Sequence, residues 1–114
     1  MQLFGIPNCS TVKKAGDWLK DHGVAYEFHD FKKNGVNKAL LEDWLNQISW
    51  EKLVNRTGMT WRNLSDTQKA AVIDAPSAMQ LMLITSSVIK RPVLVEDGKI
   101  VCLGFIEAAY KELL

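Results

Sequence analysis

The sequence predicts an α/β fold, in which a mixed four-stranded β-sheet has helices on its faces and a helical insertion between its second and third strands. Three observations support this. A strand–helix–strand pattern occupies residues 3–31, a β-hairpin pattern occupies residues 93–103, and the segment between them carries mainly helix signals. A strand, a helix and a strand in this order favour a parallel, right-handed βαβ unit.

The first strand is expected at residues 3–6, where a short apolar run ends at Pro7-Asn8. The helix after it has a charged face opposite an apolar face, which is formed by Val12, Ala15, Gly16 and Leu19. It closes at His22-Gly23, where the glycine suits a left-handed cap. The alternation of apolar and polar residues from Val24 to Phe31 predicts the second strand.

The insertion begins after an expected turn at residues 32–35. Asn37 is a candidate N-cap for a helix with an apolar stripe, formed by Leu41, Trp44, Leu45 and Ile48. Residues 49–64 carry no clear pattern. The capping box Ser65–Gln68 predicts a helix to about Ile73, and Asp74-Ala75-Pro76 restarts a helix with proline in its first turn.

The hairpin consists of Val93 to Glu96, the turn signal Asp97-Gly98, and Lys99 to Leu103. Residues 107–114 predict a closing helix. Without the insertion, these elements form a thioredoxin-like core. We therefore expect a single domain over residues 1–114, with the core at about 1–34 and 91–114 and the helical insertion at about 35–90.

Composition excludes several classes of protein. The 114 residues are 47% hydrophobic and 24% charged, which is ordinary globular usage rather than that of a disordered or collagen-like chain. The net charge of +1 provides no global attraction to nucleic acid or to an anionic membrane. The sequence shows no signal-peptide pattern, so we expect a cytoplasmic protein. Nothing in it indicates a large exposed apolar helix, so we expect a monomer. Two cysteines are too few for a disulfide scaffold or a cysteine zinc site.

Cys9 lies between the first strand and the first helix, and this location makes it the candidate nucleophile. The N–H groups and partial positive charge of a helix start favour the thiolate over the thiol. Lys13 lies one helical turn further on, and Ser10 and Thr11 add hydroxyl donors. The same geometry binds oxyanions, so Asn8, Ser10, Thr11 and Lys13 are candidate anion-binding residues.

The second thiol does not complete a redox pair. Val12 occupies the second cysteine position of a C-x-x-C motif, which excludes a thioredoxin-type dithiol cycle. Cys102 lies in an apolar strand and is expected to be a buried small hydrophobe. If Cys9 turns over, an external thiol must resolve it.

Arginine is the residue most suited to gripping a carboxylate or another oxyanion. The chain has three, and we select Arg91, directly before Pro92, and Arg56 as anion-site residues, whereas Arg62 is expected on the surface. A cis Arg91–Pro92 bond would hold backbone and side chain near the thiol, so Pro92 is also a candidate site residue.

The remaining candidates carry less chemistry. His29, at a strand end, could pair with Cys9, but an ordinary hydrogen bond is the preferred interpretation. His22 is explained by its position at a helix C-terminus. The histidines and cysteines lack metal-ligand spacing, and without a basic face the four tryptophans indicate core burial rather than base stacking.

Two separated motifs resemble the ArsC-Spx family: Gly5-Ile6-Pro7-Asn8-Cys9-Ser10-Thr11-Val12-Lys13-Lys14-Ala15 and Lys90-Arg91-Pro92-Val93-Leu94. The family comprises glutathione- and glutaredoxin-linked arsenate reductases, Spx transcriptional regulators and a YffB-type subgroup. The C-x-T-x-K-K-A form and the chain length most resemble the YffB-type subgroup. The resemblance covers essentially the whole chain, including Asn55-Arg56 and Met82-Leu83.

The resemblance implies a thioredoxin-like fold with a helical insertion and a nucleophilic Cys9. In the arsenate reductases, an arginine of the middle segment and the arginine before the proline bind the oxyanion, and these match Arg56 and Arg91. A third family arginine follows the last strand, where this chain has Leu103-Gly104-Phe105. That departure counts against arsenate reduction, and Val12 removes the C-x-x-C switch of Spx-type regulators.

The expected function is therefore that of a glutathione-dependent thiol reductase with a single nucleophilic cysteine and no bound cofactor. Glutathione is the expected co-substrate, and glutaredoxin or another thiol protein is the expected partner. Two alternatives stay open: a non-catalytic, Spx-like regulatory or protein-binding module, and a glutaredoxin-linked arsenate reductase.

Overall fold

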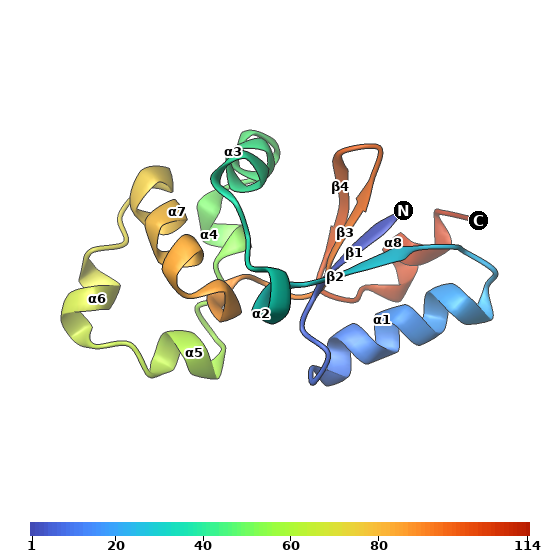
Figure 1. Cartoon of the computed structure of the whole chain (residues 1–114), viewed down its shortest axis with the longest axis horizontal. Coiled ribbons are helices and arrows are strands. Elements are labelled where there is room, and N and C mark those ends of the chain that lie inside the picture. Colours follow the sequence, from blue (N-terminus) through green and yellow to red (C-terminus); the bar gives the residue numbers. More distant parts are fainter. The chain divides into compact units, whose positions relative to one another are not determined.

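The computed structural model describes all of residues 1–114 and divides them into two compact units (Figure 1). The sheet unit comprises Met1–Asn34 and Arg91–Leu114, and the helical unit comprises Gly35–Lys90. None of the helices is long and apolar enough to cross a membrane.

The four strands of the sheet unit are β1 (Gln2–Gly5), β2 (Glu27–Asp30), β3 (Val93–Glu96) and β4 (Lys99–Leu103), in the order β2-β1-β3-β4. β1 pairs with β2 in parallel and with β3 antiparallel, and β3 pairs with β4 antiparallel. The predicted mixed sheet, with its insertion between the second and third strands, is therefore confirmed. The hairpin turn is confirmed too, because Asp97 and Gly98 both have positive φ, at 51° and 79°.

Two helices of the sheet unit, α1 (Ser10–Asp21) and α8 (Glu107–Lys111), share a hydrophobic core with one face of the sheet. The buried members of this core are Leu3, Ala15, Trp18, Leu19, Leu94, Cys102 and Tyr110. The apolar stripe predicted on α1 is buried as expected, and the helix ends before Gly23, whose φ is 70°. α8 is shorter than expected, since it ends at Lys111 rather than at the chain end.

The second strand is also shorter than the predicted Val24 to Phe31, because β2 begins only at Glu27 and ends at Asp30, where Phe31 begins the short helix α2 (Phe31–Asn34). A side-chain cap explains the end of the strand. Asp30 Oδ1 accepts the N–H groups of Lys32 at 2.8 Å and Lys33 at 3.2 Å, and this turns the chain into a helical conformation. The predicted turn at residues 32–35 is thus largely a helical turn, and it buries Phe31.

The helical unit contains α3 (Lys38–Gln47), α4 (Trp50–Leu53), α5 (Met59–Arg62), α6 (Asp66–Ala70), α7 (Ala75–Ile84) and the 3₁₀ helix η1 (Ser86–Val88). α3, α4 and η1 pack against α7, and Val54 forms an isolated bridge with Ile89. The predicted N-cap is confirmed, since Asn37 Oδ1 accepts the N–H of Leu40 at 2.8 Å.

The capping box at Ser65 is present, but the helix that it starts ends at Ala70 instead of about Ile73. The next capping box explains the early end. Ser77 Oγ accepts the N–H of Ile73 at 2.9 Å, and Asp74 Oδ1 accepts the N–H of Ser77 at 2.9 Å. The backbone N–H groups before α7 are therefore used to cap the start of that helix, as the Asp74-Ala75-Pro76 signal predicts.

Candidate functional site

Cys9 is the N-cap residue of α1, and its side chain is half-buried. Its backbone is extended, with φ −105° and ψ 121°, and its carbonyl accepts the first helical N–H, that of Lys13, at 3.0 Å. Gly5, at the end of β1, permits the tight connection, because a Cβ there would lie 2.7 Å from Val12 Cγ2. The first turn of α1 can therefore close over the end of the strand.

The pKa of the Cys9 thiol is lowered below its ordinary value. Partial burial of the sulfur acts to raise it, but the N–H groups of Val12 and Thr11 favour the thiolate, as do the hydrogen bond and the positive charge of Arg91. The outcome is a thiol with increased thiolate character at neutral pH, which is the form that acts as a nucleophile.

Arg91 reaches Cys9 because of the strand order. β1 and β3 are antiparallel, so the first residues of β3 lie beside the last residues of β1, after which Cys9 follows. Arg91 is joined by a cis peptide bond to Pro92, and Pro92 leads directly into β3. The structure thus brings together Cys9, Arg91 and Pro92, three of the predicted site residues.

The segment after β4 lies beside Pro92. The N–H of Gly104 donates to the Pro92 carbonyl at 2.8 Å, and Gly104 has a φ of 74°. This is the region in which the family resemblance implies a third arginine, and the chain has Leu103-Gly104-Phe105 there. The surroundings of Cys9 and Pro92 therefore contain fewer cationic side chains than the resemblance implies.

The other predicted residues near the thiol contribute unequally. Asn8, Ser10 and Lys13 are exposed, while Thr11 is half-buried. The hydroxyl donors expected from Ser10 and Thr11 make no hydrogen bond in the structure, and it is the backbone N–H of Thr11 that favours the thiolate. Lys13 lies one turn into α1, where it lines a groove between α1 and β2.

Arg56 belongs to the helical unit, where it contacts an acidic side chain and an aromatic side chain. Its guanidinium lies 3.7 Å from Glu51 Oε2 and 5.6 Å from the centre of the Trp50 ring. It lines a hollow of about 210 Å³ together with Glu51, Lys52, Val54, Asn55, Thr57 and Lys90. Three cationic side chains therefore gather in this part of the helical unit.

Cys102 has the opposite environment to Cys9. It is only 6% exposed, in the core of the sheet unit, and its Sγ lies 3.3 Å from the Gly104 carbonyl oxygen. Burial raises the pKa of the Cys102 thiol, although a backbone N–H at Ile106 partly opposes the effect. The prediction that Cys102 is a buried small hydrophobe is confirmed.

Neither histidine supplies a catalytic base to a thiol in this arrangement. His29 stacks on Phe4, with ring centres 4.4 Å apart, and its Nε2 lies 3.5 Å from Glu27 Oε1. His22 stacks on Trp18, and its Nδ1 lies 2.8 Å from the Trp18 carbonyl oxygen, so Nδ1 carries the donated proton. No three His, Cys, Asp or Glu side chains come together as a metal site.

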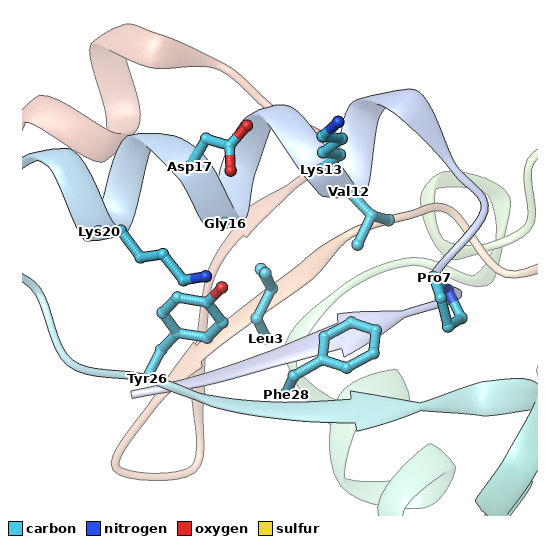
Figure 2. Close-up of a pocket in the computed structure, with 9 residues that line it drawn as sticks. All are labelled: Leu3, Pro7, Val12, Lys13, Gly16, Asp17, Lys20, Tyr26 and Phe28. Carbon is cyan, nitrogen blue, oxygen red and sulfur yellow. The ribbon is translucent and has the colours of Figure 1, made fainter.

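One feature near Cys9 was missed by the sequence reasoning. A groove of about 200 Å³ lies between α1 and β2, and Figure 2 shows the side chains that line it: Leu3, Pro7, Val12, Lys13, Gly16, Asp17, Lys20, Tyr26 and Phe28. The spacing of Tyr26 and Phe28 on one side of the second strand was an available signal. It could be used only once β2 was known to be an edge strand.

Comparison with known proteins gives a consistent result. The sequence profile of the ArsC family matches residues 4–113. A solved YffB protein is 43% identical, with a TM-score of 0.91 over 97% of this chain and 96% of that one. The solution structure of an arsenate reductase (ArsC) related protein from Brucella melitensis is 46% identical, with a TM-score of 0.78 over 97% and 91%. The global transcriptional regulator Spx of Streptococcus agalactiae is 30% identical over 115 residues, which span 98% of this chain and 81% of Spx.

Proposed function

Because the chain belongs to the ArsC family, we propose that it is a glutathione-dependent thiol reductase that uses Cys9 as its single nucleophile. The observation that carries the proposal is the lowered pKa of Cys9, which comes from the N–H groups at the start of α1 and from Arg91. A thiol of this kind is the reactive centre of disulfide exchange. Glutathione is a substrate here, and the reaction needs no bound cofactor.

The reaction has two exchange steps. In the first, the Cys9 thiolate attacks the glutathione sulfur of a mixed disulfide. A Cys9–glutathione disulfide forms, and the substrate leaves as a thiolate that takes a proton from water. In the second, the thiolate of a free glutathione attacks the glutathione sulfur bound to Cys9. Oxidised glutathione forms and Cys9 leaves as a thiolate, so the net reaction transfers the disulfide bond from the substrate to the free glutathione and needs no other oxidant or reductant.

The low pKa of Cys9 assists both steps. At neutral pH it increases the fraction of attacking thiolate in the first step. In the second step it makes Cys9 the better leaving group, since exchange is faster when the departing thiol has a lower pKa. Glutaredoxin or another thiol protein can replace the second glutathione, because only a thiolate is required there.

Glutathione carries carboxylates, and the site offers cations to hold them. Arg91 lies against Cys9, and its fork of N–H donors suits a carboxylate. Arg56 is proposed as a second anion-binding residue on the basis of the family resemblance, and the neighbouring Lys52 and Lys90 support a cationic role for that hollow. Arg91 orients a ligand at Cys9 and transfers no proton.

Glutathione chemistry is preferred to arsenate reduction because of the position that lacks an arginine. Arsenate carries more than one negative charge in a small volume and needs several charged donors around it. Leu103-Gly104-Phe105, the segment beside Pro92 in which the resemblance implies a third arginine, contains none. A carboxylate carries a single charge, so fewer cations suffice to bind it.

The test is the glutathione adduct of Cys9, measured by mass spectrometry after incubation with oxidised glutathione at neutral pH. We expect an adduct on Cys9 and none on Cys102, and we expect Cys9→Ser to abolish reduction of a small glutathione mixed disulfide. Cys102→Ser is the matched control and should retain the activity. An ordinary Cys9 pKa near about 8.5, together with no adduct, would rule out the mechanism.

The similarity to Spx favours a second candidate, a non-catalytic module that binds another protein. In that case Cys9 is dispensable. A stoichiometric protein partner recovered equally well by wild type and by Cys9→Ser, with no disulfide reduction by either, would support this candidate over the reductase.

A further inference from the structure

The groove between α1 and β2 lies within the sheet unit and starts beside the loop that carries Cys9. Pro7 stands at one end of it, two residues before Cys9, while Lys20 and Tyr26 stand at the other (Figure 2). A further hollow of about 440 Å³ adjoins that far end and shares three of its residues, Lys20, Tyr26 and Phe28. The two hollows are here together called the α1–β2 groove.

The groove follows from how α1 packs. Its buried face contacts Leu3 of β1 and Leu94 of β3, so the helix covers the centre of the sheet rather than the edge strand β2. The β2 side chain on this face is therefore left open, and Phe28 is 39% exposed. The exposed face of the Phe28 ring is thereby available as an apolar contact inside the groove.

The floor of the groove is apolar, and its rim carries charged side chains. Its floor is formed by Leu3, Val12 and Phe28. Its rim carries the ammonium groups of Lys13 and Lys20 and one carboxylate, that of Asp17, which leaves a net charge of +1. None of these three charged groups makes an ion pair within the protein, so both ammonium groups are available to a ligand.

The far end of the groove is suited to a carboxylate. The Lys20 ammonium and the Tyr26 hydroxyl point toward one another there (Figure 2). Both groups donate hydrogen bonds, and together they can hold the two oxygens of one acidic side chain. Gly16 makes room for this arrangement, because a Cβ at that position would lie 2.7 Å from the Tyr26 hydroxyl oxygen.

The length of the groove, rather than its volume, suits an extended polypeptide segment. Its two hollows, of about 200 Å³ and about 440 Å³, have room for side chains of such a segment. At about 1.5 Å per residue along α1, Lys20 lies roughly 16 Å beyond Cys9, a distance that about five extended residues span.

We infer that the α1–β2 groove docks an extended segment of a protein substrate, with the substrate's glutathionylated cysteine at Cys9 and an acidic residue about five positions away bound by Lys20 and Tyr26. The inference rests on the proposed function and specifies its substrate as a protein mixed disulfide. The glutathione half lies toward Arg91, and the polypeptide half lies in the groove. When Cys9 attacks the glutathione sulfur, the substrate cysteine leaves as a thiolate along the groove.

The test compares two short peptides, each with a central glutathionylated cysteine. The acidic peptide has glutamate, and the basic peptide lysine, at about the fifth position on each side of the cysteine. We expect wild type to reduce the acidic peptide with a kcat/KM about fivefold above that for the basic peptide, the effect of one good surface ion pair. Lys20→Glu should reverse this order, mainly through KM, and Tyr26→Phe should weaken it.

Two controls separate docking from other effects. Lys14→Glu makes the same charge change on the same helix, outside the groove, and should keep the preference for the acidic peptide. The mixed disulfide of glutathione with 2-mercaptoethanol is too small to reach Lys20, and Lys20→Glu should change its rate by less than about twofold. Equal rates for the two peptides, or equal effects of the two lysine substitutions, would overturn the inference.

Binding without turnover distinguishes this inference from the proposed reaction. The fluorescence anisotropy of a labelled acidic peptide, titrated with the Cys9→Ser protein, reports docking alone. Tighter binding of the acidic peptide that is lost in a Cys9→Ser, Lys20→Glu double variant supports the groove even if wild type reduces no disulfide. Reduction of the small disulfide with no difference in peptide binding leaves the reductase intact and removes the groove.

Discussion

The two cysteines of the sheet unit are the same chemical group in opposite surroundings. Cys9 caps a helix, is half-buried and faces Arg91, and its pKa is lowered. Cys102 lies in a strand, is 6% exposed among apolar side chains, and its pKa is raised by burial. The difference shows that the elements around a thiol, rather than the thiol itself, determine whether it is a nucleophile or a core residue.

The largest effect should be seen in alkylation of the folded protein by iodoacetamide at neutral pH. We expect Cys9 to react about a thousandfold or more faster than Cys102, because Cys102 is reached only through unfolding, which about one molecule in a thousand or fewer undergoes at equilibrium. Mass spectrometry of the two cysteine peptides over time gives both rates. The unfolded chain in urea is the control, and there the two rates should converge.

The pH dependence of the Cys9 alkylation rate should show that the pKa of Cys9 is lowered. Because the folded-state pKa of Cys9 is lowered, its alkylation rate should stay high below the ordinary thiol value of about 8.5 and fall only as the pH drops through the lowered pKa. A Cys9 profile centred at or above about 8.5 would remove the contrast between the two thiols.

Local sequence signals were sufficient to predict the different positions of the two cysteines. The position of Cys9 follows from a strand ending at Pro7-Asn8 and a helix beginning directly after it, and the burial of Cys102 follows from an apolar strand beyond an Asp97-Gly98 turn. Caps and turns depend on residues a few positions apart, which is why they can be inferred from a single sequence.

Features that depend on distant parts of the chain were not accessible in the same way. The α1–β2 groove exists because β2 is an edge strand, and strand order is not written in any local pattern. The contact between Cys9 and Arg91 likewise requires β3 to pair antiparallel with β1.

A smaller effect should come from Arg91, which contributes to the thiolate environment of Cys9. Arg91→Ala should raise the pKa of Cys9 and slow its glutathionylation at neutral pH severalfold, because a smaller fraction of the thiol is then thiolate. Arg91→Lys keeps the charge without the fork of donors and should fall between wild type and alanine.

Lys99→Ala is the matched control for charge, because Lys99 lies at the hairpin end of the same sheet, paired with Glu96. It should leave the pH profile of Cys9 unchanged. If Arg91→Ala and Lys99→Ala shift that profile equally, the lowered pKa arises from the general charge of the unit and not from the contact with Arg91.

The smallest effect concerns the core around Cys102. Tyr110 is fully buried there, its hydroxyl has no hydrogen-bond partner, and burial raises its pKa, with a further contribution from Cys102. Tyr110→Phe removes a buried hydroxyl that is desolvated without a compensating hydrogen bond. The ring keeps its edge contacts with Trp18 and Phe105. We therefore expect the free energy of unfolding to rise by up to about 1 kcal/mol, measured by urea denaturation.

Tyr26→Phe is the comparison variant, since Tyr26 is half-buried at the groove and its hydroxyl is not sealed in the core. Its free energy of unfolding should change by less than about 0.5 kcal/mol. A loss of stability above about 1 kcal/mol in Tyr110→Phe would mean that the Tyr110 hydroxyl is bonded to a bound water. The core around Cys102 would then contain water. The contrast between a dry environment for Cys102 and a polar environment for Cys9 would be weaker than we describe.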